Sequence, residues 1–111
     1  MIDITRLTER FYDVLKHVTK NVFPLVATEG CTLPFILFER SNMSETNTKD
    51  GASGLDVSFT VKIVSATYFE GLQIADDVRY NLHKMDEQPF LTSANEEYIT
   101  DGYVQTLNFS F

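Results

Sequence analysis

The sequence has little cysteine, little basic charge and no long apolar run. Cys31 is the only cysteine among 111 residues, so neither an intrachain disulfide nor a thiolate metal cluster within one chain is expected. A reducing compartment fits this composition. No window approaches the roughly 18 apolar residues of a membrane-spanning helix, and the first residues are not a basic stretch followed by an apolar run. The protein is therefore expected to stay where it is made, with no membrane partner.

Basic residues are few compared with acidic ones. Nine Lys and Arg against 16 Asp and Glu give a net charge of -7, and an acidic surface repels the phosphate backbone of nucleic acids. Tight nucleic-acid binding is therefore disfavoured, although a negative lining would let DNA slide through a passage without adhering. The hydrophobic fraction of 43%, with nine Phe and five Tyr, is enough for one packed core. We expect a single domain over residues 1–111.

Apolar residues at helical spacing predict two helices. The first begins at Ile4, and its buried stripe is Ile4, Leu7, Phe11, Val14, Leu15, Val18 and Val22. Pro24 ends this pattern, and the residues from there through Gly30 are interpreted as a connection. The second helix begins at the capping box Thr67–Glu70 and ends near Met85.

Four strands are predicted, at 34–40, at 55–63, and in a hairpin of 91–99 and 103–111 in which Gly102 supplies a positive φ. An exposed loop is expected from Ser41 to Gly54. The predicted fold is α+β, a four-stranded, largely antiparallel sheet with two helices packed on one face, in the order α-β-β-α-β-β. The other sheet face is expected to be polar, suited to solvent or a partner.

No catalytic, metal or cofactor site is predicted. Neither His17 nor His83 has a second ligand at a metal-binding spacing. Adjacent carboxylates such as Glu96 and Glu97 point away from each other, which disfavours acid–base pairing. Cys31 has no basic neighbour that would activate a nucleophile. We therefore expect a protein that is not an enzyme and binds no cofactor, with Glu96 and Glu97 as candidate partner contacts.

Several segments, taken in order, carry a resemblance to a known family. They are Phe23-Pro24-Leu25-Val26-Ala27, Leu33-Pro34-Phe35-Ile36, Thr48-Lys49-Asp50-Gly51, Tyr68-Phe69-Glu70-Gly71-Leu72 and Thr106-Leu107-Asn108-Phe109-Ser110-Phe111. This ordered set, over about residues 1 to 111, resembles a family of small phage and prophage tail-completion proteins, a domain of unknown function similar to tail terminators. No single segment is specific to that family.

The resemblance implies a structural subunit that forms a ring, expected to be a hexamer, on the end of a completed tail tube. Such a ring stops tail growth and offers a surface for head joining. Its partners would be further copies of itself, the tail tube protein and the head-tail connector protein, with DNA passing through the lumen without specific binding. Its location would be the virion tail, and the host cytoplasm during assembly. Two alternatives stay open: a head-tail connector component, and a cellular small-molecule or peptide-binding module that uses the polar sheet face.

The predicted contact surface is the polar, glycine-containing segment 46–53, because such a segment needs a partner to become ordered. Its candidate residues are Thr46, Thr48, Lys49, Asp50, Gly51 and Ser53, together with Glu96 and Glu97 farther along the chain. A plain hairpin connection without a binding role is the alternative interpretation of the segment.

Overall fold

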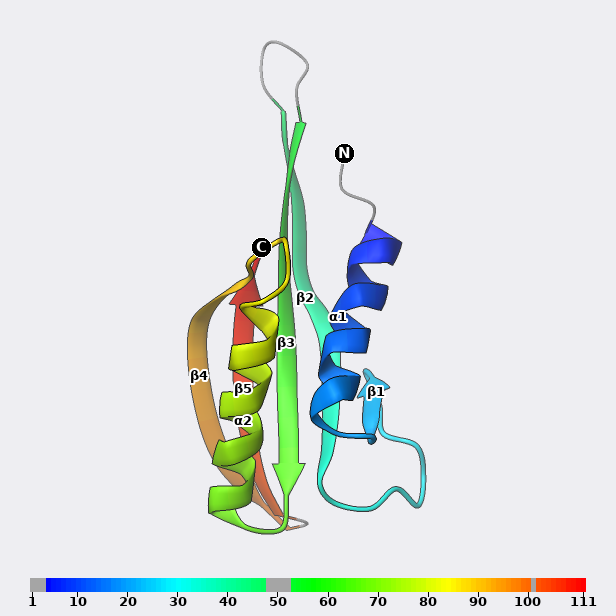
Figure 1. Ribbon diagram of the computed structural model, residues 1–111, viewed down its shortest axis with the longest axis vertical. Helices are drawn as coiled ribbons and strands as arrows, with labels where there is room; N and C mark the ends of the chain where they lie inside the picture. The colour runs from blue at the N-terminus through cyan, green and yellow to red at the C-terminus, as the bar shows by residue number, and fades with distance from the viewer. Residues whose placement is uncertain (1–3, 48–52, 101) are drawn as a thin grey trace.

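The computed structural model of this protein describes residues 4–47, 53–100 and 102–111. Across these residues, two helices and five strands follow one another along the chain (Figure 1). They are α1 (Ile4–Val18), β1 (Val22–Pro24), β2 (Phe35–Asn47), β3 (Ser53–Ser65), α2 (Tyr68–Leu82), β4 (Phe90–Ile99) and β5 (Gly102–Ser110). The strands form one sheet in the order β1-β2-β3-β5-β4.

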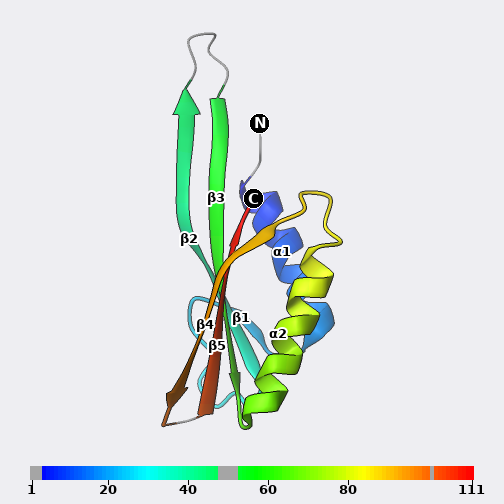
Figure 2. The same ribbon diagram turned by 90° about the vertical axis from the view of Figure 1, so that its left-hand side faces the viewer.

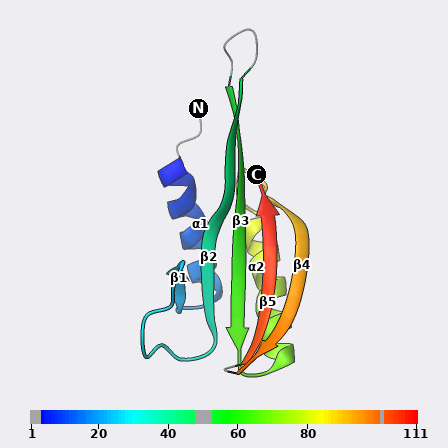
Figure 3. The same ribbon diagram turned by 180° about the vertical axis from the view of Figure 1, so that it is seen from behind.

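The sheet is antiparallel except at one edge. β2 pairs with β3, β3 with β5, and β5 with β4 in antiparallel register. β1 instead runs parallel to β2, with Val22 opposite Ile36 and Pro24 opposite Phe38. Both described helices lie on one face of the sheet (Figure 2). The view from behind shows the opposite face, with the strands in front of the helices (Figure 3). The core lies between these two layers.

α1 forms because its apolar residues recur once per turn on one side. Leu7, Phe11 and Leu15 are buried against the sheet, each at most 2% exposed. The predicted stripe ran on to Val22, but the helix ends at Val18, and Val22 is buried in β1 instead. A valine buries its side chain equally well in a helix or a strand, so apolar spacing alone does not locate the helix end.

α2 begins at the predicted cap. Thr67 has an extended backbone, and its Oγ1 accepts a hydrogen bond from the backbone N–H of Glu70 at 3.3 Å. Val78 and Leu82 then point into the core and are fully buried. The helix ends at Leu82, before the predicted end near Met85, although the Met85 side chain is still buried.

An aromatic cluster at the centre of the core joins α1 to the sheet. The rings of Phe11 and Phe59 are stacked, with centroids 4.6 Å apart and an interplanar angle of 19°. Phe111 meets both rings edge-on at 5.9 and 5.6 Å, and Phe38 is tilted against Phe11 at 6.0 Å. Each such pair contributes about 0.5–1.5 kcal/mol beyond the area it buries. The cluster therefore fixes the position of α1 over β2 and β3.

The prediction of four strands is wrong by one strand. Val22–Pro24, interpreted as part of a connection, forms β1, so the order of elements is α-β-β-β-α-β-β. A strand this short does not show a period of two, and a proline argues against a strand in the interior of a sheet. Pro24 is tolerated because β1 lies at the edge, where a missing N–H costs no ladder bond. The predicted mixture of helices with a largely antiparallel sheet is confirmed.

The predicted loop from Ser41 to Gly54 is wrong over most of its length. β2 continues to Asn47 and β3 begins at Ser53, and these two residues pair with each other. Residues 41–47 and 53–57 form a two-stranded ribbon that projects beyond the rest of the sheet (Figure 1), which we call the hairpin arm. Residues 41–45 are all exposed. A strand is predicted from alternating apolar residues only when one of its faces is buried, so no such signal marks this part of β2 in the sequence.

The predicted hairpin of the last two strands is confirmed. β4 and β5 pair from Phe90 opposite Ser110 to Ile99 opposite Gly102. Gly102 has the expected positive φ, at 153°. Asp101, in the predicted turn, lies outside the described residues.

Candidate interaction surfaces

The hairpin arm has free backbone along both outer edges. β1 ends opposite Phe38, and β5 pairs with β3 only from Ser58 onward. Within the described residues, the two strands of the arm therefore pair with each other, and the one further backbone bond is at the base, where the Val57 carbonyl accepts from the Phe111 N–H at 2.9 Å. An isolated two-stranded hairpin is marginally stable in water, and unpaired strand edges are templates for pairing with another chain. The arm is therefore suited to a partner that pairs with it or packs against it.

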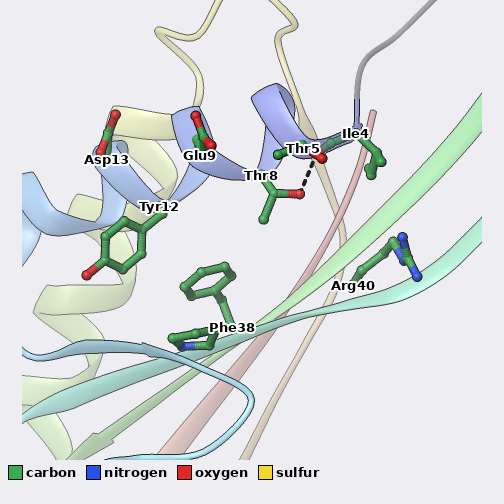
Figure 4. Close-up of a pocket in the computed structure, with 9 residues that line it drawn as sticks. Ile4, Thr5, Thr8, Glu9, Tyr12, Asp13, Phe38 and Arg40 are labelled. Carbon is green, nitrogen blue, oxygen red and sulfur yellow. Dashed lines mark hydrogen bonds between the residues drawn. The ribbon is translucent and has the colours of Figure 1, made fainter.

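An open groove of about 750 Å³, which we call the α1 groove, lies between α1 and β2 at the base of the arm (Figure 4). It is lined by Ile4, Thr5, Thr8, Glu9, Tyr12, Asp13, Pro24, Phe38 and Arg40. The rings of Tyr12 and Phe38, 5.7 Å apart, face one another from the two walls, and Arg40 lies on β2 across from the first turn of α1 (Figure 4). Beyond Phe38 this side of β2 pairs with no described strand. An apolar groove beside a free strand edge suits an extended peptide segment.

A second surface is built at the opposite end of the molecule from the arm, where α2 begins and β4 ends. Tyr68, Phe69, Tyr98 and Tyr103, which we call the aromatic patch, form a chain of edge-on ring contacts with centroids 5.0 to 6.0 Å apart. Phe69 is 78% and Tyr98 70% exposed, values that are high for large aromatic side chains. Because exposed aromatic clusters are unusual on monomers, this patch is a candidate contact surface.

Glu96 is fixed at the border of the aromatic patch by two hydrogen bonds. The Tyr68 hydroxyl donates to its Oε1 at 3.0 Å, and Gln105 Nε2 donates to its Oε2 at 3.2 Å. Gln105 is itself buried, and it pairs with Glu96 in the register of β4 and β5. The carboxylate is thus held in one orientation while it stays accessible to solvent. A positioned carboxylate beside aromatic rings suits a cationic group of a partner.

The pKa of Tyr68 is raised above its ordinary value, first by the hydrogen bond to Glu96, then by burial, and then by the negative charge of Glu96. Glu96→Gln is expected to move the pKa of Tyr68 back toward the ordinary tyrosine value, because the amide oxygen is a weaker hydrogen-bond acceptor than the carboxylate and carries no charge. The measurement is a tyrosinate absorbance titration, with Tyr68→Phe in each background to isolate the Tyr68 signal. Because the folded-state pKa is raised, any stability from this bond is present below the ordinary pKa and is lost as pH rises through the raised one. Identical titrations of Tyr68 in both proteins would contradict the assignment.

The sheet face without a helix carries a chain of side-chain hydrogen bonds across three strands. Thr60 Oγ1 donates to Asn108 Oδ1 at 2.6 Å, and Asn108 Nδ2 donates to Ser93 Oγ at 2.9 Å. Thr92 Oγ1 donates to the backbone carbonyl of Asn108 at 3.1 Å. These groups therefore bond chiefly to one another and fix the register of β3, β5 and β4.

The structure separates the residues predicted for partner contact. Thr46 and Ser53 lie on the strands of the hairpin arm, in the backbone pairs with Gly54 and Asn47. Thr48, Lys49, Asp50 and Gly51 lie outside the described residues. Glu96 and Glu97 are exposed near the end of β4, and this strand ends on the side of the molecule away from the arm (Figure 1). The prediction thus falls on two separate surfaces.

Sequence reasoning missed the aromatic patch, although a signal for it was present. Tyr98 and Tyr103 flank the turn of the predicted hairpin. If Gly102 is paired with Ile99 at the turn, Tyr98 and Tyr103 lie opposite each other, as they do in the structure. Tyr68 reaches them only through the packing of α2, which no local pattern predicts. The α1 groove likewise depends on the position of a whole helix.

The described residues offer no group of three or more His, Cys, Asp and Glu side chains that could hold a metal ion. Neither described helix has the length and apolar character needed to cross a membrane. A scan against protein-family models and a search of the curated proteins both give no match for this chain.

Proposed function

We propose that this chain is a structural phage or prophage tail protein that caps a completed tail tube as a ring, stops tail growth and offers a surface for head joining. The hairpin arm carries the proposal. Beyond Val57 it projects past the core with both backbone edges unpaired, a form that gains stability by docking onto another protein. The ordered sequence resemblance to tail-completion proteins supplies the identity of that assembly.

The charge of the protein supports the same proposal. A ring on a tail tube surrounds the path of DNA, and a chain with a net charge of -7 would line that path with repulsive charge. The α1 groove and the aromatic patch give each copy further surfaces for the tube, the connector or other copies.

Two alternatives predict different partners. A head-tail connector component would use the same surfaces to join heads to finished tails. A cellular peptide-binding module is favoured by one observation, the apolar α1 groove beside the free edge of β2. The polar sheet face gives that module less support, because Thr60, Asn108 and Ser93 bond to one another.

Deleting the gene from the source phage or induced prophage tests the proposal, with tail length and head attachment scored by electron microscopy. Overlong tubes are the expected result. Normal tails beside unjoined heads would assign the connector role instead, and intact infectious particles would contradict both.

An arm-shortened variant tests the part played by the arm. Replacing residues 44–56 by Asn-Gly lets Met43 and Val57, which already pair, close a two-residue turn. We expect a folded protein, since the buried Val57 is kept, that leaves tails as long as the deletion does. The wild-type gene supplied in the same way is the control. Tails of normal length from a folded, arm-shortened protein would show that the arm has no part in termination.

A further inference from the structure

The two edges of the molecule carry opposite charge at the end away from the hairpin arm. Around the aromatic patch, residues 66–74 and 94–100 contain Glu70, Glu96 and Glu97 and no Lys or Arg. On the other edge, Lys16 and His17 lie in the last turn of α1 and Lys20 follows it; we call these three the basic turn. All three are exposed, and residues 14–24 contain no Asp or Glu.

The positions of these surfaces make them available to two different neighbours. β4 and β1 are the two edge strands of the sheet, so the aromatic patch and the basic turn lie on opposite sides. The patch includes Tyr68 and Phe69 at the start of α2, and the basic turn lies at the end of α1. The start of α2 and the end of α1 both lie toward the end of the molecule away from the arm (Figure 1). Copies placed side by side with parallel axes therefore bring the patch of one toward the basic turn of the next.

The chemistry of the aromatic patch selects a cation. The exposed rings of Phe69 and Tyr98 offer π faces, and Glu96 is already oriented by Tyr68 and Gln105. Lysine over an aromatic ring is a contact that this chain makes within itself, since Lys84 Nζ lies 4.1 Å from the centroid of the Tyr80 ring. A lysine between ring faces and a fixed carboxylate gains both kinds of attraction.

We infer that the aromatic patch of one copy, with Glu70 and Glu96, binds the basic turn of a neighbouring copy, with Lys20 as its main contact. The contact is heterologous, because two different surfaces meet, and such contacts generate rings when the rotation between copies closes. The inference rests on the proposed ring and names the surfaces that would build it.

The test is sedimentation velocity of the whole chain under reducing conditions. Concentrations up to about 1 mM would populate even a contact with a millimolar dissociation constant. We expect wild-type protein to self-associate, and to do so less at high salt, because the charges are exposed. Glu96→Lys and Lys20→Glu should each weaken association about tenfold or more, as should Tyr98→Ser, which changes no charge. Asp86→Lys makes the same charge change as Glu96→Lys at the other end of α2 and should leave association unchanged. Thermal melts show which variants are folded.

Mixing the two charge-reversed proteins gives the sharpest result. In an array in which the two variants alternate, the aromatic patch changed by Glu96→Lys would meet the basic turn changed by Lys20→Glu. The unchanged patch of the second variant would meet the unchanged basic turn of the first. An equimolar mixture should therefore regain association close to wild type. A mixture no tighter than either protein alone would overturn the inference, as would wild-type protein that stays monomeric throughout. An effect of Glu96→Lys without one of Lys20→Glu would also overturn it, by assigning a symmetric contact.

This outcome is independent of the tail-length experiment. Restored association together with normal tails in the deletion would keep the contact and reject the proposed function. Overlong tails in the deletion, together with a mixture that does not regain association, would keep the proposed function and reject the contact.

Discussion

Phe59→Ala is expected to lower the free energy of unfolding by about 3–5 kcal/mol, the usual cost of removing a buried phenylalanine ring. Phe59 is 1% exposed and stacks on Phe11 at 4.6 Å, with Phe111 edge-on at 5.6 Å. The ring thus contacts both α1 and the segment after β5, so the cavity would open where the two layers meet. Domains of this size are stable by only about 5–15 kcal/mol, so this substitution would remove a large part of the total stability.

Urea denaturation of the two proteins measures this loss. Phe90→Ala is the matched control, because Phe90 is 55% exposed on the edge strand β4 and should change the unfolding free energy by less than about 1 kcal/mol. Equal effects of the two substitutions would show that the aromatic cluster is not the centre of the core.

Gly102→Ala is expected to produce the second large loss. A Cβ on residue 102 would clash with the backbone carbonyl oxygen of Ser65, and a backbone atom of β3 cannot move aside without disturbing the sheet. The φ of 153° adds strain for any residue with a side chain, of order 1–3 kcal/mol. The clash and the strain act together, so we expect a total loss above the strain alone.

Gly30→Ala separates the two causes. Gly30 also has a positive φ, of 83°, but a Cβ there would have nothing within 4 Å. The stability lost in Gly30→Ala therefore measures backbone strain without a clash. Denaturation of both variants should show a larger loss for Gly102→Ala. Similar losses would mean that the Ser65 backbone yields, and that the close approach of Ser65 to Gly102 does not constrain the fold.

The sequence predicted those elements that bury one face. Val57, Phe59, Val61 and Ile63 alternate with exposed or polar positions, and each is at most 1% exposed in β3. The cap at Thr67 was predicted for a local reason, because its hydroxyl satisfies a backbone N–H three residues on. In both cases the physical cause lies within one short stretch of chain.

The elements that escaped prediction depend on partners distant in the sequence or on backbone alone. β1 exists because Val22, Phe23 and Pro24 meet β2, and the hairpin arm because two polar stretches pair without a buried face. Of the candidate contact residues, Glu96 and Glu97 were selected for their charge, which can be read from the residues themselves without knowledge of the fold. The rings that surround Glu96 come from α2, β4 and β5 and meet only in the folded protein.

The place of β5 in the sheet has a consequence for how this protein folds during synthesis. β5 follows the other described strands along the chain, yet it lies inside the sheet, between β3 and β4. Until it has left the ribosome, β4 has no strand to pair with, and one side of β3 stays open. The β2–β3 hairpin can form early from local contacts, whereas the rest of the sheet must wait for long-range pairing, which is slow. A nascent chain should therefore gain its protease resistance in one late step.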